Sequence, residues 1–211
     1  HRPLVVFTSQ DSHYSISKAA NWMGLGMNNV VKVKTNKEGA MIPAELEIAI
    51  KVSREIGKRP LAVVVTAGTT VLGAFDPFVE IAEICEREQI WMHCDAAWGG
   101  GFIFSKKLRD KCLKGVERCD SICWNAHKML GAPLQCSALI TKQPDIILNC
   151  NSLNATYLFQ QDKYYPPEYD SAGDKSIQCG RKPDAFKLWY MWLGVGVEGF
   201  QKAVESVEDC A

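Results

Sequence analysis

The sequence predicts an α/β fold in which helices cover a mainly parallel β-sheet. Short apolar runs alternate along the chain with longer segments whose apolar residues recur at helical spacing. One run, residues 61–66, is apolar at almost every position and rich in valine, which is typical of a strand buried on both faces of a parallel sheet. The chain has 211 residues, enough for one sizeable domain with a substantial core.

The expected strands are short and mostly apolar, and turn-forming or polar residues bound them. They cover residues 4–9, 30–33, 61–66, 90–94, 121–124 and 137–140. Helical segments separate several of them, and such crossovers join parallel strands. We therefore expect a mainly parallel sheet.

Four segments carry helical signals. They cover residues 12–23, 43–56, a stretch that begins at 76, and 183–193. Ser12 is a suitable N-cap for the first helix. A proline opens the second helix, and Gly57 supplies its stop. Between the last strand and the last helix, residues 149–174 form a long polar loop with Pro166-Pro167 at its centre, and loops of this length are usually functional or disordered.

Charge and composition argue against several kinds of partner. Lys and Arg number 24 and so do Asp and Glu, which gives no support for a nucleic-acid or anionic-membrane partner. No run approaches the roughly 18 apolar residues that a membrane span needs, and no signal peptide is visible. We expect a cytoplasmic protein.

The nine cysteines predict reduced, mostly buried thiols. Their number is odd and no CxxC motif occurs. The closest pair, Cys119 and Cys123, has no second pair at metal-ligand spacing, so we expect no metal site. This usage fits a cytosolic protein.

Two ionisable residues stand where predicted strands end. Asp95 ends the run 90–94, and Lys128 follows Asn125-Ala126-His127 beyond the next strand. The 33 positions from 95 to 128 allow one crossover and one further strand, so both side chains can reach one pocket at the carboxyl edge of the sheet. Pyridoxal 5'-phosphate (PLP) chemistry needs such a pair: a lysine amine for the cofactor aldehyde and a carboxylate that keeps the pyridine nitrogen protonated. Taken singly, Lys128 also fits a solvated surface residue and Asp95 an N-cap.

Two glycine-containing segments lie beside these residues. The turn 66–70 is rich in hydroxyls that can hydrogen-bond a cofactor, and a plain β-turn fits it equally well. Residues 96–101 (Ala-Ala-Trp-Gly-Gly-Gly) are mostly small, which would let a flat ring approach the backbone. A flexible turn is the alternative there.

A histidine and a tyrosine complete the candidate residues. His13, at a strand-to-helix junction, can stack on a pyridine ring and shuttle protons, or it can simply cap the helix. Tyr157 lies on the long loop, where a phenol can close over a substrate and donate a proton. A packing anchor is the alternative interpretation of this tyrosine.

Together these residues resemble the group II PLP-dependent amino-acid decarboxylases. The motifs at 12–15, 66–76, 95–101 and 125–128 stand in family order and at family spacing, and the resemblance covers essentially the whole chain. It implies the large domain of the aspartate-aminotransferase fold (fold type I), PLP as the cofactor and an active site at a homodimer interface.

The resemblance also implies a role for each candidate. Lys128 would be the Schiff-base lysine, Asp95 the partner of the pyridine nitrogen, and His13 the residue stacked on the ring. The remaining cofactor contacts would come from Thr70, Ala97, Asn125 and His127. Tyr157 stands where the family carries its catalytic-loop tyrosine, and the implied catalytic set is Lys128, Tyr157, His13 and His127.

Within the family, residues 158–163 and 173–181 are similar to the branch that acts on acidic substrates. This branch includes cysteine sulfinate decarboxylase and its acidic amino acid decarboxylase relative. The resemblance implies decarboxylation of cysteine sulfinate or aspartate, to hypotaurine or β-alanine. Glutamate decarboxylation to GABA is one alternative, and a non-catalytic dimerising fragment that does not hold PLP is another.

The sequence departs from the family pattern in three respects. Ala126 stands where the family usually has proline, which we expect to loosen the turn that aims Lys128. Pro166-Pro167 would make the loop longer and stiffer. The chain begins with His1, and we expect residues 1–211 to be a PLP-binding large domain without its upstream phosphate-cradling segment and its downstream small domain.

Overall fold

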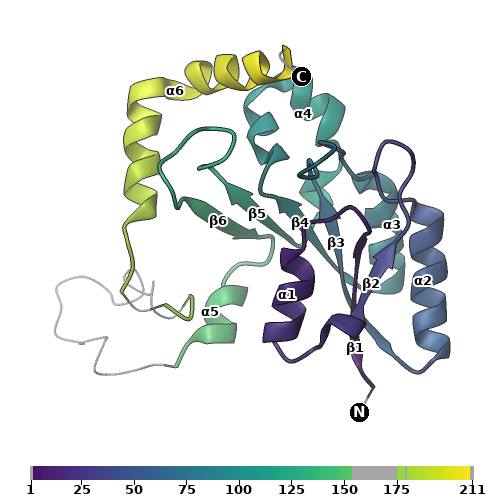
Figure 1. The fold of residues 1–211 in the computed structure, drawn as a ribbon. Helices are drawn as coiled ribbons and strands as arrows, with labels where there is room; N and C mark the ends of the chain where they lie inside the picture. Colours follow the sequence, from purple (N-terminus) through teal and green to yellow (C-terminus); the bar gives the residue numbers. More distant parts are fainter. Residues whose placement is uncertain (1, 154–174, 179, 210–211) are drawn as a thin grey trace.

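The protein, described by a computed structural model for residues 2–153, 175–178 and 180–209, is built on one six-stranded sheet (Figure 1). The strand order is β2-β1-β3-β4-β5-β6. The first four pairings are parallel, and only β5 and β6 pair antiparallel. The predicted α/β class with a mainly parallel sheet is confirmed.

All six predicted strands are present. Their bounds are β1 Leu4–Ser9, β2 Val30–Val33, β3 Arg59–Thr66, β4 Trp91–Ala96, β5 Ser121–Asn125 and β6 Ser137–Thr141. The carboxyl half of β3 is buried on both faces, since Val63, Val64 and Val65 are all nearly inaccessible. The valine-rich run therefore marks an interior strand, as expected.

Helices and short 3-10 turns connect the strands. The helices are α1 Ser15–Trp22, α2 Pro43–Glu55, α3 Phe78–Glu88, α4 Lys106–Cys112, α5 Ile146–Asn151 and α6 Asp184–Asp209. The 3-10 turns are η1 Met27–Asn29, η2 Gly99–Phe104 and η3 Val116–Arg118. At the end of α2, Gly57 has a positive φ of 78°, and it supplies the predicted stop.

Three predicted boundaries were wrong. The first helix begins at Ser15 rather than at Ser12, whose hydroxyl accepts a hydrogen bond from Lys32 Nζ instead of capping the helix. Helix α5 occupies the start of the predicted loop, and Pro166-Pro167 lies outside the described residues. Helix α6 continues to Asp209 after a bend at Gly196, which has φ 67° and ψ 172° (Figure 1). This backbone conformation is not helical and glycine permits it, so α6 consists of two helical segments that meet at the bend.

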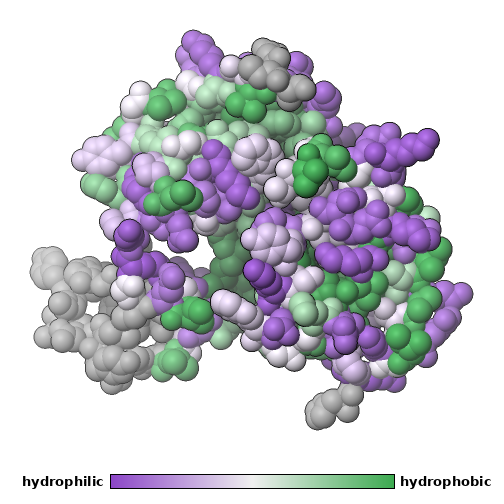
Figure 2. All heavy atoms as spheres, viewed as in Figure 1, coloured by the Kyte–Doolittle hydropathy of each residue, from purple (hydrophilic) through white to green (hydrophobic). Residues whose placement is uncertain are grey.

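The two faces of the sheet are covered unequally. Helices α2 and α3 bury one face, where Leu46 and Ile81 belong to the same core as Phe7, Val65 and Met92 of the strands. Helix α1 lies on the opposite side (Figure 1). Figure 2 shows a hollow between α1 and α5 with hydrophobic residues in its wall.

Strand β4 shows how the sequence assigns side chains to the two faces. Its residues alternate between fully buried positions, 92, 94 and 96, and half-buried positions, 91, 93 and 95. The buried set lies in the core under α2 and α3. Asp95 therefore projects from the other, more open face, as the period of two in a strand requires.

The three glycines after β4 are packing residues. A Cβ on Gly99 would lie 2.6 Å from the Ala67 carbonyl oxygen and 2.7 Å from the Phe75 ring. On Gly100 and Gly101 it would meet Trp124 and Met129, each at 2.6 Å. These three glycines thus allow other parts of the protein to pack closely against η2, whereas the approach of a flat ring to residues 96–101 stays a prediction.

Within the described ranges, no helix is long and apolar enough to cross a membrane. The seven described cysteines are free thiols, and four of them are buried. The same part of the chain contains no cluster of three or more His, Cys, Asp or Glu residues that could hold a metal ion.

We predict that Gly99→Ala destabilises the fold. The added methyl would displace the Ala67 carbonyl or the Phe75 ring, which should cost about 1–3 kcal/mol of unfolding free energy. Urea denaturation followed by circular dichroism measures the change. Gly194→Ala is the matched control, because a Cβ there has nothing within 4 Å, and it should be neutral or slightly stabilising. Equal stability of the two variants would contradict the packing role of Gly99.

Candidate active site

The candidate residues follow four strands that are neighbours in the sheet. His13 comes after β1, Thr70 after β3, Asp95 near the end of β4, and residues 125–128 at the end of β5. These four strands are mutually parallel, so their carboxyl ends lie at one edge. Segments more than a hundred residues apart in sequence therefore converge there, where α/β sheets bind ligands.

Asp95 is held at this edge through only one of its two carboxylate oxygens. It pairs in register with Thr66 on one side and Cys123 on the other. Its Oδ1 accepts hydrogen bonds from the Ala97 N–H at 3.1 Å and from Cys123 Sγ at 3.8 Å. The bond from Ala97 is a local turn contact, and the expected alternative of an N-cap does not apply, because Trp98 is the N-cap residue of η2. Its Oδ2 makes no hydrogen bond with any described residue, so the carboxylate can accept one from a ligand.

The Cys123 thiol places Asp95 and Lys128 in one electrostatic environment. Burial, followed by the charge and the hydrogen bond of Asp95, raises the pKa of Cys123 to about 11 overall, although the Lys128 charge acts to lower it. Both charges are therefore close enough to affect one sulfur atom. The Lys128 side chain forms no ion pair or hydrogen bond within the described part of the chain, which leaves its amine available.

A closed turn carries Lys128. Its amide donates to the Asn125 carbonyl at 3.0 Å, and its own carbonyl accepts from Gly131 at 3.1 Å. Residue Ala126 is buried, and its carbonyl accepts from the Ala132 N–H at 3.1 Å. These contacts hold the turn in place, and the expected loosening by Ala126 relative to proline stays a prediction.

His127 is fixed across the same turn. Its Nδ1 lies 3.0 Å from the Cys136 N–H nitrogen and 2.9 Å from the Cys136 carbonyl oxygen. A neutral imidazole satisfies one of these contacts in each tautomer. When Nδ1 accepts from the N–H, Nε2 carries the proton and can donate to an anion.

His13 and Thr70 are placed at the edge without direct evidence for a cofactor contact. His13 Nδ1 bonds the Ser15 hydroxyl at 2.8 Å and accepts from the Ser15 N–H at 3.3 Å, which is the helix-capping alternative. Thr70 is exposed, whereas the buried Thr69 closes its turn by accepting from the Ala74 N–H at 3.0 Å. Tyr157 lies outside the described residues.

Three buried hydroxyls at this edge were missed by the sequence analysis. The side-chain oxygens of Thr8, Ser9 and Thr66 are buried and have no hydrogen-bond partner in the described part of the molecule. Thr8 and Thr66 lie on the same face of the sheet as Asp95, whereas Ser9 lies on the face covered by α2 and α3. Because buried polar groups without partners are costly, the first two hydroxyls are candidates to contact a polar ligand. The sequence feature that could have indicated them is a serine or threonine at the end of the apolar runs 4–9 and 61–66.

Asp76 was also missed, because the sequence analysis treated it only as a helix start. It is almost completely buried, and its two oxygens accept from the Met41 and Thr66 N–H groups, both at 2.7 Å. Burial raises the pKa of this carboxyl to about 6, against the lowering effect of the two N–H donors. Asp76 thus ties the end of β3, next to Asp95, to the segment before α2.

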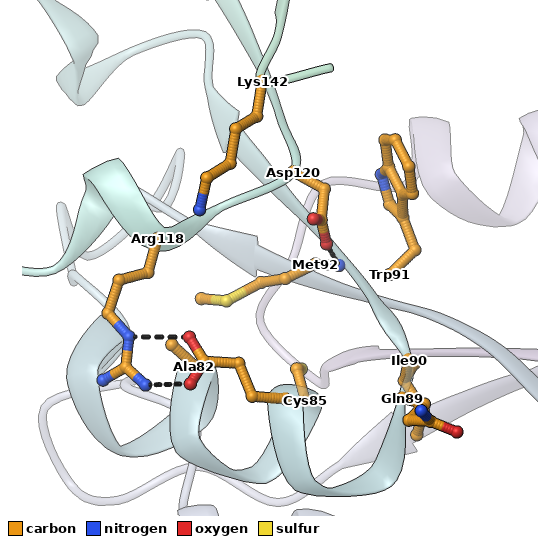
Figure 3. Close-up of a pocket in the computed structure, with 10 residues that line it drawn as sticks. Ala82, Cys85, Gln89, Ile90, Trp91, Met92, Arg118, Asp120 and Lys142 are labelled. Carbon is orange, nitrogen blue, oxygen red and sulfur yellow. Dashed lines mark hydrogen bonds and ion pairs between the residues drawn. The ribbon is translucent and has the colours of Figure 1, made fainter. Parts of the chain in front are cut away.

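The cavity in Figure 3 is a different feature, at the amino ends of β4 and β5. It has a volume of about 310 Å³, and Arg118, Asp120 and Lys142 contribute its charges. Arg118 binds both oxygens of Glu86 and holds the pKa of that carboxyl below its usual value. Asp120 accepts from the Met92 N–H at 2.7 Å. The main charges are engaged within the protein, so we place the candidate site at the opposite edge.

Comparisons with known proteins agree on one family. The model of the pyridoxal-dependent decarboxylase conserved domain matches residues 1–211. The mouse protein acidic amino acid decarboxylase GADL1 is 52% identical over 202 residues, which are 95% of this chain and 36% of the relative. The chain therefore spans little more than a third of that protein's length.

Solved structures extend the likeness to the fold. The crystal structure of mouse CSAD in apo form has a TM-score of 0.92 and 43% identity, and the match covers 100% of this chain and 43% of the mouse chain. The structure of Oryza sativa TDC with PLP and tryptamine has a TM-score of 0.86 and 28% identity, over 95% of this chain and 41% of the rice chain. Fold type I, implied by the resemblance, is confirmed by these neighbours.

We predict a characteristic pH dependence for Asp76. Its pKa is raised in the folded protein, so the carboxyl's contribution to stability is present below about pH 3.8 and is lost as pH rises through about 6. The difference in unfolding free energy between wild type and Asp76→Asn should therefore fall by up to about 3 kcal/mol across this window. Urea titrations at a series of pH values measure it. A difference that rises with pH would mean that the N–H donors outweigh burial.

Proposed function

Because the chain belongs to the pyridoxal-dependent decarboxylase family, we propose that it forms the cofactor-binding core of a PLP-dependent amino-acid decarboxylase. The observation that carries this proposal is the placement of Asp95, near the end of β4, and of Lys128, just after the parallel neighbour β5, at the same carboxyl edge of the sheet. Asp95 Oδ2 and the Lys128 amine each have no hydrogen-bond or ion-pair partner among the described residues. This is the pair that PLP chemistry requires.

The residues at this edge suit the cofactor. PLP, when bound, supplies an aldehyde that links to a lysine amine and a ring that accepts the electron pair left by a departing carboxylate. We assign Lys128 to the aldehyde and Asp95 to the ring nitrogen. The unpartnered Thr66 hydroxyl, next to Asp95 in register, is a further hydrogen-bonding group for the ring side.

Each proposed residue has a task within this arrangement. Asp95 Oδ2 holds a proton at the ring nitrogen, because a nearby negative charge favours the protonated cation. With PLP bound, the Lys128 amine would hold the cofactor through its aldehyde. His127 is anchored through Nδ1, so its Nε2 would be the ring nitrogen that contacts a ligand. The family resemblance implies that His13 would stack on the ring of bound PLP and that Tyr157 would supply the proton for the substrate α-carbon.

The remaining members of the proposed site follow from position. Ala97 lies two residues after Asp95, Asn125 lies three residues before Lys128, and Thr70 lies in the turn that follows β3. The family resemblance further implies a homodimer, with Tyr157 reaching the site of the neighbouring subunit. We retain both statements as parts of the proposal.

We propose an acidic amino acid as the substrate. The support is the 52% identity to a mouse protein whose name states this activity. Cysteine sulfinate and aspartate are the first candidates, with hypotaurine and β-alanine as products. Glutamate is the alternative substrate. A non-catalytic dimerising chain that does not hold PLP is the alternative to an enzyme.

The first test is covalent attachment at Lys128. Full-length protein loaded with PLP and reduced with borohydride should carry the cofactor on the peptide that contains Lys128, identified by mass spectrometry. Lys128→Ala should lose this label and at least about a thousandfold in decarboxylation rate, since the covalent step has no substitute amine. Lys142→Ala, at the opposite edge of the sheet, is the control and should label normally. Label on another lysine would refute the assignment.

The second test concerns the substrate. We expect the full-length protein with PLP to release carbon dioxide from cysteine sulfinate or aspartate with a higher kcat/KM than from glutamate, and to leave tryptophan untouched. The reason is that a site built to pair a distal acid discriminates strongly against analogues without it. Amine products are separated by chromatography. Dominant GABA formation would favour glutamate, and no product together with no bound PLP would favour the non-catalytic alternative.

A further inference from the structure

The turn that carries Lys128 is fastened from outside by α6. Lys187 Nζ donates hydrogen bonds to the carbonyl oxygens of Pro133 at 3.0 Å and Gln135 at 2.5 Å. The same nitrogen lies 2.8 Å from Asp184 Oδ1 in an ion pair. Two of the three ammonium hydrogens are donated to these carbonyls, whereas the contact with Asp184 Oδ1 is an ion pair without hydrogen-bond geometry.

The contacts of Lys187 lead to the candidate site through Cys136. The residue next to Gln135 is Cys136, whose backbone N–H and carbonyl hold His127 Nδ1. The Cys136 thiol also donates to the Asp184 carbonyl at 3.6 Å. The first turn of α6 therefore contacts the segment 133–136, just before β6, at Pro133, at Gln135 and at Cys136, the residue that orients His127.

Apolar packing continues the same interface. Ala126, Ala132 and Cys136 form a small buried cluster against which Leu188 and Met191 of α6 pack. A lysine is not needed to fill this interface, because the apolar contacts do so. The two hydrogen bonds from Lys187 to backbone carbonyls instead fix the position of residues 133–135 relative to α6.

We propose that Lys187 is a positioning residue that sets the orientation of His127 and Lys128 by clamping the backbone of residues 133–135. This inference rests on the proposed function, and it adds a residue about 60 positions from the cofactor lysine to the machinery of that site. Side chains that hold functional residues in place affect activity without touching the reacting atoms.

The test compares three variants of the full-length protein. Lys187→Met keeps the aliphatic stem and removes the donors, and Lys187→Arg restores donors to the carbonyls. Lys202→Met makes the same change at an exposed position of the same helix and is the matched control. The measurements are the rate of PLP loss on dialysis, the visible circular dichroism of the bound cofactor, and the melting temperature of the cofactor-free protein.

We expect Lys187→Met to release PLP roughly 10- to 100-fold faster than wild type, because two charge-assisted hydrogen bonds to the turn are lost. The dichroism of the cofactor remaining bound should change, and Lys187→Arg should recover most of both properties. Lys202→Met should match wild type.

Two outcomes would overturn the proposal. One is release and dichroism in Lys187→Met equal to those of Lys202→Met. The other is that Lys187→Met lowers the melting temperature of the cofactor-free protein, Lys187→Arg restores it, and both variants release PLP at the wild-type rate. Lys187 would then be only a stabilising residue. If Lys187→Met does not fold, Lys187→Gln, which keeps a shorter donor, is scored by the same criteria. Failure of wild type itself to bind PLP would instead refute the proposed function.

Discussion

Parallel pairing of β1, β3, β4 and β5 is the constraint on which the candidate site depends. It brings four segments from distant parts of the sequence to one edge, and its register sets Asp95 between Thr66 and Cys123. A slip of β4 by one residue would turn Asp95 toward the core beneath α2 and α3, where a charge without a partner is very costly. The hydrophobic pattern of β4 thus fixes its register and with it the face from which the Asp95 carboxylate projects.

The loops that follow these strands are held by polar contacts to the backbone. Asp76 accepts two N–H groups beneath the β3 turn, Cys136 holds His127, and Lys187 binds two carbonyls on the far side of the same turn. Each contact satisfies a backbone group that irregular structure would otherwise leave unpaired. The site is therefore built on rigid strand ends and on loops that are individually fastened, which is what orientation of a cofactor demands.

Much of the fold and the central pair could be predicted from the sequence, for identifiable reasons. Strand periodicity is a local property, so the six strands and the position of Asp95 at a strand end followed from short windows. The roles of Asp76 and Lys187 could not be predicted, because their partners lie 10 to 54 residues away and are backbone atoms, which leave no pattern in the side chains. The purpose of Gly99 was hidden for the same reason, since its neighbours Ala67 and Phe75 come from another strand's loop.

The central claim is that Asp95 controls the protonation of a cofactor carried by Lys128. Its most direct test is nitrogen-15 NMR of the full-length protein loaded with PLP labelled at the ring nitrogen. In wild type, the resonance should be that of a protonated pyridine at neutral pH, because the Asp95 carboxylate stabilises the cation. In Asp95→Asn it should shift to that of an unprotonated ring while the cofactor stays bound. A protonated ring in both proteins, or an unprotonated ring in wild type, would contradict the account.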